Sequence, residues 1–99
     1  WQRDMERLAA LRNVVCKISG IVVQARERWV ADDLAPVINH SLTTFGADRV
    51  MFAGDWPVCT LRATYRQWVE ALRAITRNRS AEDNRKLFHD NAVRFYGLN

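Results

Sequence analysis

Apolar residues recur along the chain with two different periods, and the change of period separates predicted helices from predicted strands. Helical spacing predicts helices over residues 1–12, 32–45 and 64–76. Their apolar stripes are Trp1, Met5, Leu8 and Leu11; then Leu34, Val37, Ile38, Ser41, Leu42 and Phe45; then Tyr65, Trp68, Val69, Leu72 and Ile75. The spacing therefore predicts amphipathic helices, each with one face packed on a core.

Capping residues predict where these helices begin and end. We expect Asn13 and Gly46 to end the first two, because both residue types tolerate a left-handed turn. We expect Asp32 or Asp33 to cap the second, with Pro36 in its first turn.

A last helix is predicted over residues 80–96. The stretch Ser80-x-x-Asp83 resembles a capping box, and Gly97 supplies a stop. Its apolar residues are Leu87, Phe88, Ala92, Phe95 and Tyr96. Residues 21–31 show no clear period, so loop, irregular helix and a further strand all remain open there.

Two short apolar runs predict strands: "NVVCKISG" at residues 13–20 and "VMFA" at residues 50–53. The first resembles a strand buried on both faces near its start, with Lys17 and Ser19 emerging at its carboxyl end. A helix lies between the two runs, which is typical of a parallel βαβ crossover. The predicted order is α-β-α-β-α-α, in the α/β class.

Two parallel strands with four helices do not close a sheet, because each strand is an edge. The pattern indicates part of a (β/α)₈ TIM barrel or the end of an open α/β sheet. With 99 residues and 48% hydrophobic content, the chain holds one modest core, so we expect one domain over residues 1–99. It begins without Met or a signal core, as if in the middle of a longer protein.

Polar residues follow both predicted strands, where ligands meet parallel α/β folds. The first strand offers Lys17 and Ser19, and the second offers Asp55 and Trp56. A right-handed crossover places both carboxyl ends on one side, so these residues are predicted to face one cavity. Asp55 has two interpretations from spacing alone: a turn residue, or a carboxylate that takes a proton from water or binds a metal.

The other candidates carry weaker evidence. Lys17 fits a solvent-exposed strand end better than a Schiff-base lysine, and Ser19 lacks the context of a nucleophile elbow. His40 and His89 lie off the apolar faces of their helices, which favours surface histidines over metal ligands. Trp56 either walls a pocket or covers the end of the barrel.

Charge and cysteines narrow the class of protein. The net charge is +4, with thirteen Arg against two Lys, spread along the chain among acidic residues. Arg62, Arg66, Arg73 and Arg77 fall near one helical face around Glu70, which favours a solvated face over a phosphate-binding stripe. The two cysteines, Cys16 and Cys59, fit reduced thiols in a cytoplasmic protein. No apolar run is long enough to span a membrane.

The motifs as a set resemble the C-terminal third of the amidohydrolase-2 family. The most specific is Gly54-Asp55-Trp56-Pro57, which is similar to that family's G-S-D-W-P at the eighth strand, with Ala53-Gly54 where many members have Gly-Ser. "CKISG" resembles the seventh-strand motif, and Asn91-Ala92 resembles the terminal-helix motif. Members of this family are metal-dependent TIM-barrel hydrolases, and they include lactonases.

The resemblance implies a site as well as a fold. It makes Asp55 an active-site aspartate, acting as general base on a lactone or related cyclic carbonyl substrate, or as a metal ligand. Lys17, Ser19 and Trp56 become expected substrate contacts. The family's H-x-H and its later strand-end histidine are not in this chain. We therefore expect no cofactor in this chain, and a divalent metal such as zinc only in a complete barrel.

Three hypotheses follow. The first is a segment of an amidohydrolase, inactive alone, whose completed barrel takes a small-molecule substrate. The second is a non-enzymatic barrel remnant that assembles as a homo-oligomer, with strands from two copies sharing a sheet. The third and weakest is a basic nucleic-acid-binding module, which rests on the arginine excess alone. The preferred hypothesis expects neither nucleic acid nor membrane as a partner.

Overall fold

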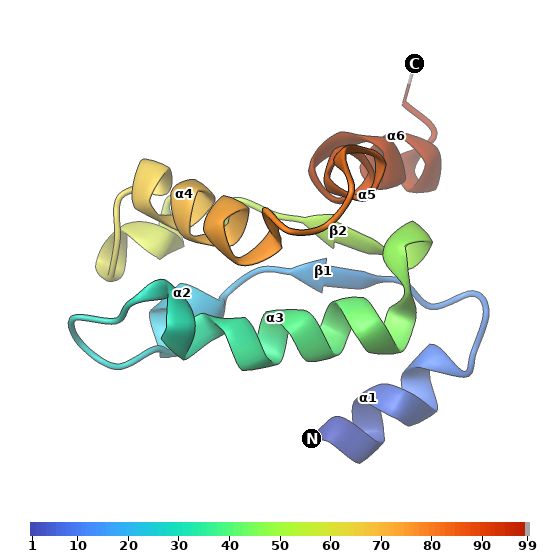
Figure 1. The fold of residues 1–99 in the computed structure, drawn as a ribbon, viewed down its shortest axis with the longest axis horizontal. Coiled ribbons are helices and arrows are strands. Elements are labelled where there is room, and N and C mark those ends of the chain that lie inside the picture. The colour runs from blue at the N-terminus through green and yellow to red at the C-terminus, as the bar shows by residue number, and fades with distance from the viewer. Residues whose placement is uncertain (99) are drawn as a thin grey trace.

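Two short strands run parallel through the middle of the fold (Figure 1). β1 (Cys16–Ile18) pairs with β2 (Val50–Phe52), so that Lys17 lies opposite Met51. This confirms the predicted parallel pair. Both strands are shorter than predicted, and the prediction of a fully buried start to the first is wrong, because residues 14–16 are only half-buried.

The computed structural model describes residues 1–98. Its helices are α1 (Gln2–Ala9), α2 (Ile21–Gln24), α3 (Ala31–Phe45), α4 (Tyr65–Thr76), α5 (Ala81–Arg85) and α6 (Asn91–Tyr96). The 3₁₀ turns Ala47–Arg49 and Val58–Leu61 flank β2, and the π-helical turn Lys86–Asp90 joins α5 to α6. The order is thus mixed α/β, as predicted, and residues 21–31 form the short helix α2 and a loop. None of the described helices is long and apolar enough to cross a membrane.

α3 begins earlier than predicted. Its first residue is Ala31, and Val30 precedes it in an extended conformation, so neither Asp32 nor Asp33 is the N-cap. Asp33 instead accepts a hydrogen bond from the Val30 backbone N–H at 2.8 Å, from within the first turn. Pro36 consequently lies inside the helix rather than in its first turn. Gly46 ends the helix as predicted, with a φ of 81°.

The C-terminal helix is interrupted, whereas a single helix was predicted. Ser80 caps α5 as expected, accepting the Asp83 N–H at 3.0 Å, and Gly97 ends α6 in the left-handed conformation. The π-helical turn between them shifts the helical register, because it adds a residue to one turn. Leu87 is buried as predicted, but the prediction that Phe95 and Tyr96 pack on the core is wrong, since both are about half exposed.

The core lies between the sheet and the helices on its two flanks. α3 runs antiparallel along β1, while α4 and the C-terminal helices lie along the β2 side (Figure 1). The largest fully buried side chains include Trp68 from α4 and Ile18 from β1. Trp68 also donates its indole N–H to the Ala53 carbonyl at 3.2 Å, which fixes α4 against the end of β2.

Two side chains hold the amino ends of the strands through main-chain oxygens. Arg49 donates to the carbonyls of Ala9, Leu11 and Val14 at 2.7, 3.0 and 3.2 Å, and so joins α1 and the approach to β1 to the start of β2. We call this group of bonds, together with those of Asn91 described next, the carbonyl clamp.

Asn91 completes the carbonyl clamp from the C-terminal helix. Its side chain is 1% exposed and donates to the carbonyls of Ala47 at 2.6 Å and Val50 at 2.8 Å. Arg94 donates to the Asn91 side-chain oxygen at 3.0 Å and to the Asp48 carbonyl. The amino ends of the two strands are therefore held by several side-chain hydrogen bonds, and the carboxyl ends continue into turns.

Candidate functional site

Asp55 lies three residues beyond β2, on the carboxyl edge of the sheet. Its backbone φ is 53°, in the left-handed region, which costs a non-glycine residue about 1 kcal/mol. Its carbonyl accepts the Cys59 N–H at 2.7 Å, so the chain turns sharply into the 3₁₀ turn at Val58–Leu61. The side chain is half-buried. A residue held in a sparsely populated conformation at this edge fits a functional role better than a plain turn.

The Asp55 carboxylate faces Gly20, which lies two residues beyond β1. One of its oxygens, Oδ2, lies 3.8 Å from the point where a Cβ on Gly20 would stand. Gly20 itself has a φ of 71° and is the N-cap residue that precedes α2. The carboxyl ends of the two strands thus lie side by side, as the crossover predicted, with the Asp55 side chain facing the turn at Gly20.

The other predicted site residues do not gather around Asp55 in the same way. The Lys17 ammonium lies 5.9 Å above the ring of Tyr96 in α6, which favours a cation–π contact there. Ser19 is half-buried beside Gly20. Trp56 follows Asp55 in the turn after β2, and its side chain is 69% exposed.

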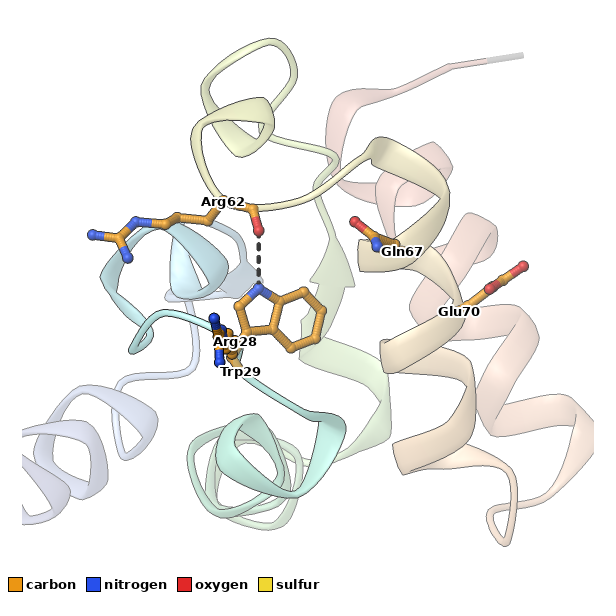
Figure 2. Close-up of a pocket in the computed structure, with 5 residues that line it drawn as sticks. All are labelled: Arg28, Trp29, Arg62, Gln67 and Glu70. Carbon is orange, nitrogen blue, oxygen red and sulfur yellow. Dashed lines mark hydrogen bonds between the residues drawn. The ribbon is translucent and has the colours of Figure 1, made fainter.

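A separate pocket opens between the loop before α3 and the start of α4 (Figure 2). Its volume is about 290 Å³, and Arg28, Trp29, Arg62, Gln67 and Glu70 line it. The Trp29 indole N–H donates to the Arg62 carbonyl at 3.2 Å, while the Arg62 guanidinium and the Glu70 carboxylate extend away on opposite sides. None of the predicted site residues lines this pocket, and its charged groups do not converge on one point.

The residues of this chain do not fit a zinc site by themselves. Zinc sites in enzymes use about three protein ligands from His, Cys, Asp or Glu. Across residues 1–98, no three such side chains stand close enough together to hold a metal ion. Asp55 could supply one ligand, so no step of the chemistry below is drawn through a metal.

Most of the arginines with described contacts bind side chains or main-chain oxygens of this same chain. Arg26 pairs with Asp33 at 3.1 Å, Arg66 with Glu70 at 3.9 Å, and the Arg73 guanidinium lies over the Phe88 ring. These contacts are typical of a solvated, ion-paired helix surface.

Both cysteines are free thiols. Cys59 is buried, and burial raises the pKa of the Cys16 thiol, partly offset by a hydrogen bond with Ser41. A raised thiol pKa keeps Cys16 protonated near neutral pH, which does not suit a nucleophile.

Comparison with known proteins agrees with this geometry. The sequence profile of the amidohydrolase family Amidohydro_2 matches residues 1–98. The L-fucono-1,5-lactonase of Burkholderia multivorans is 38% identical over 104 residues, and the uncharacterized protein y4mH of Sinorhizobium fredii is 38% identical over 96 residues. These matches cover 97–99% of this chain but only 32–35% of the relatives.

Solved structures superpose closely on the whole chain. A zinc-bound crystal structure of an amidohydrolase from Burkholderia multivorans matches with a TM-score of 0.94 at 34% identity, and a HEPES-bound structure with 0.93 at 37%. Each match covers 100% of this chain and 37% of the solved chain. The chain belongs to the amidohydrolase family. It spans about a third of the relatives that it matches.

The sequence did not indicate how the site is supported. Tyr65 was predicted only as part of the apolar stripe of α4, yet its ring lies against Gly54: a Cβ on Gly54 would stand 2.7 Å from Tyr65 Cε2. Gly54 directly precedes Asp55. A glycine directly after a strand was the available sign of a close approach by another group.

Proposed function

We propose that this chain carries the catalytic carboxylate of a lactone hydrolase, and that Asp55 is that carboxylate. The observation that supports this most directly is the placement of Asp55: it lies three residues beyond β2, at the carboxyl edge, and its side chain faces the turn after β1. Active sites of parallel α/β enzymes lie at this edge. Membership of the amidohydrolase family and a relative named as a lactonase support the reaction class.

As a general base, the carboxylate would remove a proton from a water molecule. The resulting hydroxide would attack the lactone carbonyl carbon, and the ring C–O bond would break to give a hydroxy acid. The ring oxygen leaves as an alcohol after gaining a proton, so the net reaction consumes one water. Groups that polarise the carbonyl would come from the part of the relatives that this chain does not span. Lys17, Ser19 and Trp56 remain proposed substrate contacts from this edge.

The direct test is a chimera in which this chain replaces the aligned C-terminal third of the Burkholderia multivorans lactonase. We expect the chimera to hydrolyse L-fucono-1,5-lactone or another aldonolactone. Asp55→Asn should lower kcat by about 10²–10⁴-fold, because amide nitrogen and oxygen cannot take the proton. Asp32→Asn, an exposed carboxylate on α3, is the matched control and should leave kcat unchanged.

Two results would reject the proposal. One is a folded chimera that hydrolyses no lactone. The other is an Asp55→Asn chimera as active as its parent. The zinc affinity of the chimera separates the two roles of Asp55: a metal-ligand role predicts weaker zinc binding by the Asp55→Asn variant, whereas a purely general-base role predicts unchanged binding.

The chain alone is expected to be inactive, because residues 1–98 provide one strand-end carboxylate and no cluster of three side chains that could hold a metal ion. Lactone hydrolysis is followed by the acid it releases, measured with 99-residue protein at micromolar concentration. Turnover above the buffer rate that depends on Asp55 would contradict this expectation.

A second candidate function is assembly with another copy of the chain. Each strand of the two-stranded sheet has one edge unpaired among the described residues, and Trp56, Leu61, Phe95 and Tyr96 are largely exposed. Unpaired edges and exposed apolar side chains favour association. We expect a dimer or larger species in size-exclusion chromatography with light scattering, and a monomer at 50 μM would reject this candidate.

A further inference from the structure

Ala53, two residues before Asp55, is held by hydrogen bonds to β1 and α4. The Ala53 N–H donates to the Ile18 carbonyl at 3.1 Å, and the Ala53 carbonyl accepts the Trp68 indole N–H at 3.2 Å. Both main-chain groups of Ala53 are therefore bonded, one to β1 and one to α4. The next residue along the chain, Gly54, has no side chain to add to this hold.

The Tyr65 ring occupies the space that a side chain on Gly54 would need. The 2.7 Å between Tyr65 Cε2 and that Cβ position is shorter than any contact such atoms make, so the ring can lie there only because residue 54 is glycine. The ring is fixed in turn from below, since it meets the Phe52 ring edge-on with centroids 6.4 Å apart.

The backbone of Tyr65 is fixed as well. It is the first residue of α4, and a capping box precedes it: Thr64 Oγ1 accepts the Gln67 N–H at 3.0 Å, and Gln67 Oε1 accepts the Thr64 N–H at 2.8 Å. The start of α4 therefore presents the ring to Gly54 from a rigid helix end.

Asp55, just beyond Gly54, needs such support. Its left-handed backbone is unfavourable for a residue with a Cβ, and such conformations persist where the surroundings hold them. On its far side the carboxylate faces Gly20, where an added Cβ would stand 3.8 Å from Oδ2. The turn therefore has the Tyr65 ring on the Gly54 side and Gly20 on the carboxylate side.

We infer that Tyr65 is a positioning residue for Asp55: its ring packs on Gly54, holds the left-handed turn, and thereby aims the carboxylate at the carboxyl edge. This inference rests on the proposed function only for its catalytic consequence. The structural part, that the ring holds the turn, stands without it.

Hydrogen exchange at the Cys59 amide tests the structural part in the 99-residue chain. That N–H donates to the Asp55 carbonyl at 2.7 Å, so its exchange reports opening of the turn. Tyr65→Ala should speed its exchange at least tenfold, while the amides of buried Ile38 and Leu72 stay protected. Tyr65→Phe, which keeps the ring, should match the parent chain. Tyr96→Ala is the control, because Tyr96 is also about half exposed but lies on α6.

Coupling between the two residues gives a second, independent measurement. Gly54→Ala should displace the ring and speed Cys59 exchange as Tyr65→Ala does. The double variant should exchange no faster than either single variant, because both remove the same contact. Additive effects, or an unchanged Cys59 rate in a folded Tyr65→Ala chain, would overturn the inference.

The catalytic part uses the lactonase chimera. Tyr65→Ala should lower kcat about tenfold with KM unchanged, since the ring supports the carboxylate and is not expected to touch the substrate. Tyr65→Phe should restore kcat. If Asp55→Asn leaves activity intact but Cys59 exchange still responds to Tyr65, the proposed function fails and the positioning of the turn stands. If the exchange does not respond, the positioning fails whatever the activity.

Discussion

At the scale of the residue, the backbone conformation of Asp55 is locally unfavourable but sets the position of its carboxylate. Its left-handed backbone is a conformation that glycine adopts freely. Asp55→Gly should therefore raise the free energy of unfolding, or leave it unchanged, within about 1 kcal/mol. Urea denaturation followed by tryptophan fluorescence measures this. Asp32→Gly, in the first turn of α3, is the comparison and should lose about 0.5–1 kcal/mol, because helix positions disfavour glycine.

A loss of stability in Asp55→Gly as large as that in Asp32→Gly would mean that the carboxylate itself stabilises the fold. In the chimera, the same Asp55→Gly variant should have lost turnover. A variant that gains stability while it loses activity is the expected pattern for a strained functional residue.

The position of Asp55 at the end of the second strand was predictable from the sequence, but the packing around it was not. Asp55 stood at a strand end, and the crossover rule placed it on the ligand side. The contact between Tyr65 and Gly54 joins residues eleven positions apart across a turn. No periodicity reports such a contact, because Tyr65 fits the apolar stripe of α4 equally well.

At the scale of the element, Asn91 fastens the C-terminal helix to the sheet. Asn91→Ala would leave the buried carbonyl of Val50 and the part-buried carbonyl of Ala47 without this donor. An unsatisfied buried carbonyl costs about 1–3 kcal/mol and a part-buried one less, so we expect a total loss of about 2–4 kcal/mol in unfolding free energy. Thermal or urea unfolding checks this. Asn78→Ala, an exposed asparagine after α4, should change stability by less than about 0.5 kcal/mol. Equal effects would contradict the role of Asn91.

Helix positions were predicted well and their ends less well. Apolar periodicity located α3 and α4, and Gly46 stopped α3. The start of α3 was missed because Asp33 bonds backward to Val30 from within the helix, rather than capping it from outside. The π-helical turn at Lys86–Asp90 was missed because one added residue in a turn leaves the apolar pattern almost unchanged.

At the scale of the whole molecule, three exposed carboxylates give a pH dependence with a definite sign. The Val30 N–H and Arg26 lower the pKa of Asp33, Lys86 lowers the pKa of Asp48, and His89 and Arg85 lower the pKa of Asp90. Each folded-state pKa thus lies below the unfolded value, so the stabilisation is present above about pH 4 and is lost as the pH falls through the lowered values.

Thermal unfolding by circular dichroism at pH 7, 5, 4 and 3 measures this dependence. We expect a midpoint that is steady from pH 7 to 5 and falls below pH 4. Asp33→Asn should flatten the decline, because it removes one of the three groups. A midpoint that rises on acidification would contradict the stabilising role of the three ionised carboxylates.

The parallel pair and the α/β class were predictable because strand, helix and strand follow one another within forty residues. What the sequence could not supply is the set of groups around Asp55. Those contacts depend on loop backbones such as the turns at Gly20 and Asp55, whose conformations are set by tertiary packing.

The carbonyl clamp has a consequence for sequence variation. Arg49 and Asn91 bond to main-chain oxygens of Ala9, Leu11, Val14, Ala47 and Val50, an atom that every amino acid possesses. Substitutions at those five positions leave the acceptors in place, so only the two donors need to be kept. Such an arrangement allows the side chains at these five positions to vary in sequence while the backbone stays in place.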